Sequence, residues 1–118
     1  YVPARVSLAE FYLIQQRFEE ALVQYQALGR LRPEDLAAQV GMAQCLIPMG
    51  RAREAVAILE GVLKSAPGFI PAHLHLGLAY RALGETEQAA AQWREVLRLD
   101  PGNPVASALL AEVAGGKP

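Results

Sequence analysis

The sequence predicts an all-α protein in which helix pairs stack one after another into a solenoid. The first observation is a repeat of 34 residues, seen in the prolines Pro33, Pro67 and Pro101. The second observation is that alanines and large apolar residues recur with the same 34-residue spacing, as in the series Ala21, Ala55, Ala89 and the series Tyr25, Leu59, Trp93. The third observation is that apolar residues recur at helical spacing in two runs within each period. One helix pair cannot bury its apolar face alone, so such units must stack.

Each of three units, at about residues 2–35, 36–69 and 70–103, is therefore predicted to hold two helices within a single domain over residues 1–118. In the first unit the apolar runs cover roughly residues 4–15 and 18–31. Gly50 and Gly84 separate the two runs of the later units, where a tight or left-handed turn suits glycine. Gln16 takes the corresponding place in the first unit.

Pro48 departs from this pattern because it falls near the end of the first helix of the second unit. Proline cannot donate a hydrogen bond to the carbonyl of Gln44. Two interpretations stay open. Either the helix ends early before Gly50, or the freed carbonyl binds a ligand.

A further helix is expected at about residues 104–114. Asn103 is a good N-cap, and Pro104 suits the first helical turn. By register this helix is the first helix of a fourth unit. It serves either as a cap over the last apolar face or as the start of a further repeat.

Small residues stand where the helices are expected to cross closely, at Ala9, Ala43 and Gly77 on the first helices and at Ala21, Ala55 and Ala89 on the second. A larger side chain at such a position would push the helices apart. Trp93 follows the run Ala89–Ala91, and we expect it to fill the space between neighbouring helices as a core residue.

The third unit, "HLHLGLAYRALGETEQAAAQWREVLRLDP", resembles the tetratricopeptide repeat family in its order of small, aromatic, glycine, alanine and proline residues. The second unit substitutes Met42 and Leu46, and the first lacks the central glycine but keeps Phe18 and Ala21. The resemblance covers almost the whole chain. It implies a right-handed α-solenoid, a binding function and no catalytic residues.

The resemblance also implies that the first helices line a concave groove for a protein or peptide partner. The residues predicted to face it are Val6, Glu10, Leu13, Ile14, Val40, Gln44, Ile47, Leu74, Leu78, Arg81, Ala108 and Glu112. This strip is apolar with few charges, which favours an amphipathic or extended apolar peptide as the ligand.

Some family members hold a C-terminal carboxylate with lysine, asparagine and arginine side chains along these helices. The corresponding places here carry Val6, Glu10, Gly41, Pro71 and His75, so that carboxylate clamp is not expected. The alternative to peptide binding is an assembly module. Such a module would self-associate as a homo-oligomer or pack against other parts of its parent protein.

The composition argues against several other functional classes. The net charge is −1, from 11 basic and 12 acidic side chains, so a nucleic-acid footprint is not expected. No apolar run is long enough to insert this segment into a membrane. Cys45 is the only cysteine, and His73 and His75 lie about 200° apart around a helix, so they cannot clamp one metal ion. Without a catalytic motif either, we expect no enzyme activity, cofactor or metal.

The chain opens on Tyr1 rather than methionine, which we interpret as a piece of a longer protein. Its localisation therefore stays open between the cytoplasm and a bacterial periplasm. The composition, rich in alanine, leucine and arginine, suggests a bacterial source.

Overall fold

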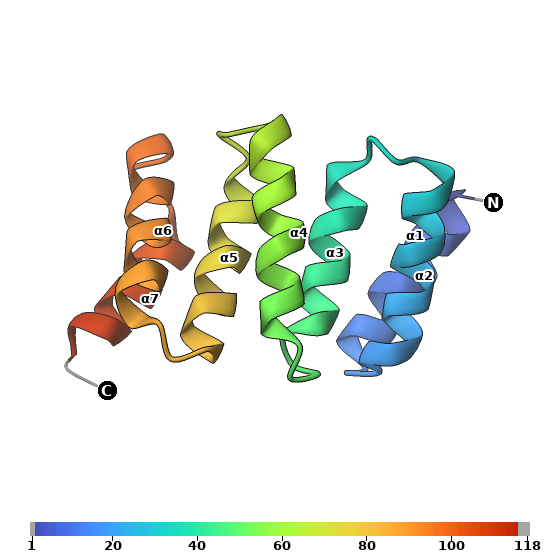
Figure 1. Ribbon diagram of the computed structural model, residues 1–118, viewed down its shortest axis with the longest axis horizontal. Helices are drawn as coiled ribbons and strands as arrows, with labels where there is room; N and C mark the ends of the chain where they lie inside the picture. Colours follow the sequence, from blue (N-terminus) through green and yellow to red (C-terminus); the bar gives the residue numbers. More distant parts are fainter. Residues whose placement is uncertain (1, 116–118) are drawn as a thin grey trace.

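The described residues form seven helices, which follow one another along the long axis from the N-terminal end to the C-terminal end (Figure 1). The computed structural model describes residues 2–115, and this part contains no strand. The helices are α1 Val2–Ile14, α2 Phe18–Leu31, α3 Leu36–Leu46, α4 Ala52–Ser65, α5 Ile70–Ala82, α6 Thr86–Leu99 and α7 Pro104–Ala114. The molecule measures 44 × 25 × 23 Å, the elongated shape of a stacked repeat. The prediction of an all-α solenoid is confirmed.

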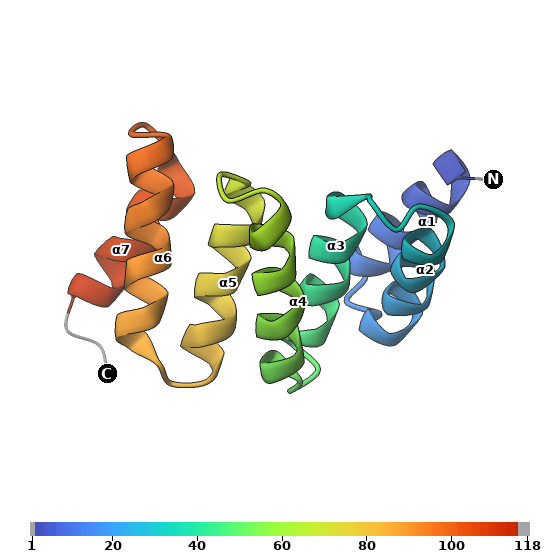
Figure 2. The same cartoon turned by 45° about the horizontal axis from the view of Figure 1, so that its top comes forward.

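Each helix packs against the next, and α3 also contacts α5 directly. The odd-numbered helices therefore form one layer and the even-numbered helices the other, and the turned view in Figure 2 shows the same succession. One core cluster joins α1 to α5. A smaller cluster around Ala89, Trp93, Val96 and Ala106 joins α5, α6 and α7. The odd-numbered layer is the surface on which a binding site was predicted.

The helix pairs are joined by turns of the same construction. Gly50 and Gly84 both have φ of 79°, and the residue after each donates its N–H to the carbonyl five positions earlier, from Arg51 to Leu46 and from Glu85 to Tyr80. Glycine reaches this left-handed region without a steric penalty. The sequence prediction for these two glycines is confirmed.

Gln16 closes the equivalent turn with φ of 59°, and Arg17 donates to the carbonyl of Tyr12 in the same way. A side chain with a Cβ is strained in this conformation, by roughly 1–2 kcal/mol. We expect Gln16→Gly to raise the free energy of unfolding by about 1 kcal/mol, measured by urea denaturation. The neighbouring exposed Gln15 is the control, because Gln15→Gly relieves no such strain. An equal gain from both variants would contradict this explanation.

Pro48 lies beyond the end of its helix. Helix α3 has 11 residues and stops at Leu46, whereas α1 and α5 each have 13. The interpretation of Pro48 as an early stop is therefore confirmed.

The start of α3 is capped by Asp35, whose side chain accepts the N–H groups of Ala37 and Ala38 at 3.0 and 3.3 Å.

The terminal helix begins as the sequence predicts. The Asn103 side chain accepts the N–H of Ala106 at 2.9 Å, and Pro104 is the first residue of α7. The glycine pair Gly115–Gly116 predicts the end of this helix. The helix ends at Ala114, and Gly116 lies outside the described residues.

The six small residues predicted at helix crossings lie in the interior. The five alanines among them are 0% exposed, and Gly77 is buried against Trp93. The Trp93 ring is also 0% exposed, and its Nε1 donates to the carbonyl of Leu74 at 3.2 Å. Trp93 is therefore a core residue with its polar atom paired.

Candidate functional site

Two neighbouring hollows lie over the odd-numbered helices. The first, which we call the Leu78 hollow, encloses about 350 Å³ and is lined by Leu13, Ile14, Gln16, Phe18, Gln44, Ile47, Pro48, His75 and Leu78. The second, the Val40 hollow, encloses about 280 Å³ and is lined by Val6, Glu10, Tyr25, Leu28, Asp35, Ala37, Ala38, Val40, Gln44, Phe69, Pro71 and His75. Most of these side chains are apolar, so both hollows suit apolar ligand groups.

A polar pair separates the two hollows, because Gln44 and His75 line both of them. The Nε2 atoms of the two side chains lie 3.1 Å apart, and the pair joins α3 to α5. Burial lowers the pKa of His75 below its ordinary value of 6.5. A neutral imidazole has an acceptor nitrogen, so its Nε2 can accept an amide hydrogen of Gln44 while Nδ1 carries the ring proton.

Acidification should therefore destabilise the protein through His75. Below about pH 6.5 an unfolded histidine binds a proton, while the folded His75 with its lowered pKa still resists protonation. The free energy of unfolding is expected to fall through this window until the folded pKa is reached. Urea unfolding at pH 7.5 and 5.5 measures the change. A His75→Gln variant should show a smaller fall, and an identical fall in both proteins would contradict the assignment.

The Val40 hollow carries acidic side chains, because the carboxylates of Glu10 and Asp35 line it. Among residues 2–115, neither lysine nor arginine lines either hollow. Among the twelve predicted groove residues, the cationic one is Arg81, which pairs with Glu112 at 3.1 Å across α5 and α7. Both side chains of this pair are largely exposed. The hollows therefore offer no positive charge to an acidic ligand.

The twelve residues predicted to face the groove take four kinds of position. Eight line the two hollows: Val6, Glu10, Leu13, Ile14, Val40, Gln44, Ile47 and Leu78. Arg81 and Glu112 form the ion pair beyond them, and Ala108 is exposed on α7. Leu74 is half-buried against the C-terminal core cluster, where its carbonyl receives the Trp93 hydrogen bond. The structure thus brings together the predicted residues of α1, α3 and the end of α5.

Several lining residues were not predicted from the sequence. His75 was assigned to a groove position only as a substitute for a clamp residue, and its pairing with Gln44 was not foreseen. Phe18 and Phe69 lie at the starts of α2 and α5, outside the face defined by the first helices. The helical period could have marked His75, three residues before Leu78, as a neighbour on that face.

The remaining histidine and the cysteine are buried, and the histidine is hydrogen-bonded within the protein. His73 is 8% exposed, its Nε2 lies 2.7 Å from the carbonyl oxygen of Pro67, and its Nδ1 lies 2.8 Å from Oε1 of Gln92. Cys45 is 0% exposed, and burial raises the pKa of its thiol to about 11. Residues 2–115 hold no group of three side chains arranged for a metal ion. No helix in the described part is long and apolar enough to span a bilayer.

The chain is similar to known proteins over most of its length. Residues 12–74 and 70–103 each match a family model described as a tetratricopeptide repeat. The mouse FK506-binding protein-like is 33% identical over 81 residues, which cover 69% of this chain and 23% of the relative. Cellulose synthase 2 operon protein C of Komagataeibacter xylinus is 29% identical over 105 residues, covering 78% of this chain and 8% of the relative. The chain thus spans less than a quarter of these relatives, and a mammal and a bacterium among them leave its source unassigned.

Solved structures confirm the fold. The first TPR domain of Spaghetti (RPAP3), bound to the HSP90 peptide SRMEEVD, superposes with a TM-score of 0.86 at 19% identity. The match covers 98% of this chain and 91% of that domain. Together with the two matching family models, this fold places the chain in the tetratricopeptide repeat family.

Proposed function

We propose that the chain binds an apolar segment of a partner protein across the Leu78 and Val40 hollows. The observation that carries this proposal is the pair of adjacent apolar hollows on the odd-numbered helices, joined by the Gln44–His75 contact. Each hollow has room for one or two large apolar side chains. Burying one such side chain contributes about 1.5–3 kcal/mol, so a few anchors are enough for micromolar affinity.

The Gln44–His75 pair offers hydrogen-bonding groups to the backbone of the ligand. It lies between the two hollows, where the backbone of a bound segment would pass. The second amide hydrogen and the carbonyl of Gln44 can pair with peptide groups that would otherwise lose their hydrogen bonds to water. Apolar anchors on both sides of this pair would then fix the register of the segment.

The charge of the hollows argues for a ligand different from that of the RPAP3 domain. The peptide bound there, SRMEEVD, carries three acidic residues near its end. Here Glu10 and Asp35 line the Val40 hollow, and within residues 2–115 no lysine or arginine lines either hollow, so acidic groups would meet like charges. We therefore propose a neutral or basic apolar segment as the ligand.

The test begins with peptides selected from a random displayed library against the chain. The affinity of the selected peptide is then measured for the parent chain, for a double variant that carries both Ile47→Glu and Leu78→Glu, and for the control Val23→Glu. The Val23 side chain is 55% exposed on α2. We expect the double variant to weaken binding at least about tenfold because it loses two apolar contacts. The control should bind as the parent does, and SRMEEVD should not compete. Binding unaffected by the double variant, or displaced by SRMEEVD, would contradict the proposal.

A further inference from the structure

A separate hollow lies between α2 and α3, and we call it the Gly29 hollow. It encloses about 430 Å³. Its lining comprises Gln26, Gly29 and Arg30 of α2, Pro33 of the following loop, and Gln39 and Met42 of α3. None of these six residues lines the Leu78 or the Val40 hollow, so the Gly29 hollow is a different surface from the proposed binding site.

The Gly29 hollow exists because one apolar side chain of the repeat is missing. Leu63 and Leu97 stand one and two periods after Gly29, and both are half-buried against the core clusters. A Cβ at Gly29 would lie 3.9 Å from Sδ of Met42, which is an ordinary van der Waals contact. No close approach therefore requires a glycine here, although glycine inside a helix is destabilising. The hollow thus takes the place of a leucine side chain that the later units supply themselves.

A positive charge at the hollow lacks the partner that its counterpart has. Arg98 stands two periods after Arg30, and its Nε donates to Oε1 of Glu95 at 2.9 Å. Ala27 occupies the position of Glu95 in the first unit, so this carboxylate is absent beside Arg30. Of the six lining residues Arg30 alone is charged, and no ion pair among residues 2–115 includes it. Missing apolar bulk and an unpaired cation therefore occur at the same place.

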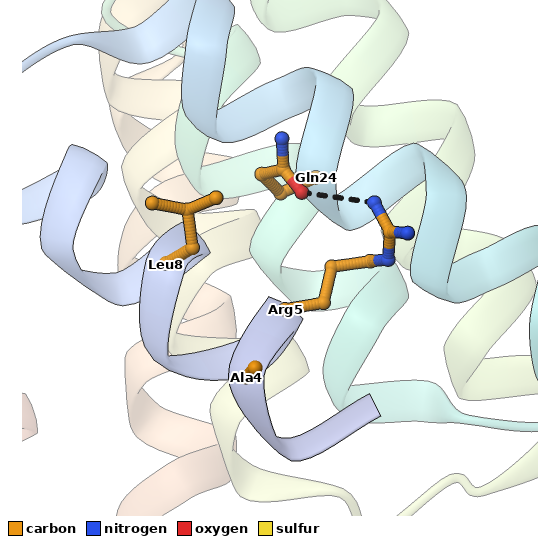
Figure 3. Close-up of a pocket in the computed structure, with 4 residues that line it drawn as sticks. All are labelled: Ala4, Arg5, Leu8 and Gln24. Carbon is orange, nitrogen blue, oxygen red and sulfur yellow. Dashed lines mark hydrogen bonds between the residues drawn. The ribbon is translucent and has the colours of Figure 1, made fainter. Parts of the chain in front are cut away.

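The hollow beside α1 does not show this combination. Figure 3 shows it, with a volume of about 230 Å³ and with Arg5 reaching to Gln24, where Nη1 donates to Oε1 at 3.1 Å. Its apolar lining residues, Ala4 and Leu8, correspond to Ala38 and Met42 one period later, so no side chain is missing from its wall. The two departures from the repeat distinguish the Gly29 hollow from it.

We propose that the Gly29 hollow binds one leucine-sized aliphatic side chain of a partner protein, with an adjacent carboxylate of that partner paired to Arg30. Leu63 and Leu97 define the size of the side chain, because they fill the equivalent space in their own units. The carboxylate complements the charge of Arg30, as Glu95 does for Arg98. The partner thus supplies the two groups that the later repeats take from their own chain. This proposal goes beyond the proposed function and does not depend on it.

The size of the hollow is tested by Gly29→Leu in the chain itself. We expect the midpoint of thermal unfolding to rise by roughly 5 °C or more, since the new side chain fills the hollow and a glycine leaves the helix. The matched control is Gly61→Leu on α4, where a Cβ meets no atom within 4 Å. This control should gain about half as much, because only the helix propensity improves. An equal rise in both variants would overturn the assignment of the space to a leucine side chain.

Binding is tested with a random displayed peptide library, selected on the parent chain and depleted on Gly29→Leu. We expect the retained peptides to carry an aliphatic residue next to an aspartate or glutamate. Their affinity should fall at least about tenfold for Gly29→Leu, because the hollow is filled. For Arg30→Gln it should fall roughly two- to fivefold, the usual effect of an exposed ion pair.

Three variants serve as controls and should bind these peptides as the parent does. They are Gly61→Leu, Lys64→Gln at the counterpart of Arg30 one period later, and the double variant Ile47→Glu with Leu78→Glu. The double variant separates this surface from the proposed function. The higher midpoint of Gly29→Leu shows that its loss of binding is not unfolding. The proposal is overturned if no peptide distinguishes the parent from Gly29→Leu, or if the peptides that do so bind Arg30→Gln as tightly as the parent.

Discussion

Replacing Trp93 by alanine is expected to lower the free energy of unfolding by about 3–5 kcal/mol, the usual cost of deleting a large buried aromatic side chain. The ring is 0% exposed at the centre of the C-terminal core cluster. The variant also leaves the carbonyl of Leu74 without the hydrogen bond from Nε1. This is a large part of the 5–15 kcal/mol that typically stabilises a domain.

The loss should be concentrated in α6 and α7, because units of a solenoid contact only their neighbours. Amide hydrogen exchange resolved by residue measures this directly, with strong deprotection expected for α6 and α7 and little change in α2 and α3. Phe11→Ala serves as the control, since that side chain is half-exposed and should cost less than about 1 kcal/mol. A small, evenly spread effect of Trp93→Ala would contradict the role given to Trp93.

The second large effect is expected from Gly77→Val, at about 3 kcal/mol of destabilisation. A Cβ at Gly77 would lie 2.2 Å from Nε1 and 2.6 Å from Cε2 of Trp93. The buried ring has no space to move aside, so α5 and α6 would have to separate. Urea denaturation followed by circular dichroism measures the loss.

Gly61 provides the matched control for this substitution. It also lies in a helix, but a Cβ there meets no atom within 4 Å. Gly61→Val should change stability by only a few tenths of a kcal/mol. The clash can be isolated by repeating Gly77→Val in the Trp93→Ala background, where most of its cost should vanish. An equal cost in both backgrounds would show that the ring is not the cause.

The sequence alone determined the repeat, the nature of its elements and the positions of its turns. A 34-residue period fixes which residues play equivalent parts, and the helical period fixes which side of each helix is apolar. Gly50, Gly84 and the Asn103–Pro104 helix start could be predicted because their effects are local. The small residues at the crossings followed from the repeat as well, since every unit must pack in the same way.

Tertiary structure alone decided which side chains from different helices meet. A Cβ on Gly41 would lie 2.4 Å from the ring of Tyr25, and no local sequence pattern predicts this close approach. The division of the groove by Gln44 and His75 has the same origin, because these residues are 31 positions apart. Among residues 2–115 the buried Nε of Arg5 has no hydrogen-bond partner, whereas Gln39 and His73, one and two periods later, contact the carbonyls of Pro33 and Pro67. This difference is also a tertiary finding. Periodicity tells which face a residue lies on, but the distance and angle between two faces depend on how all the side chains between them pack.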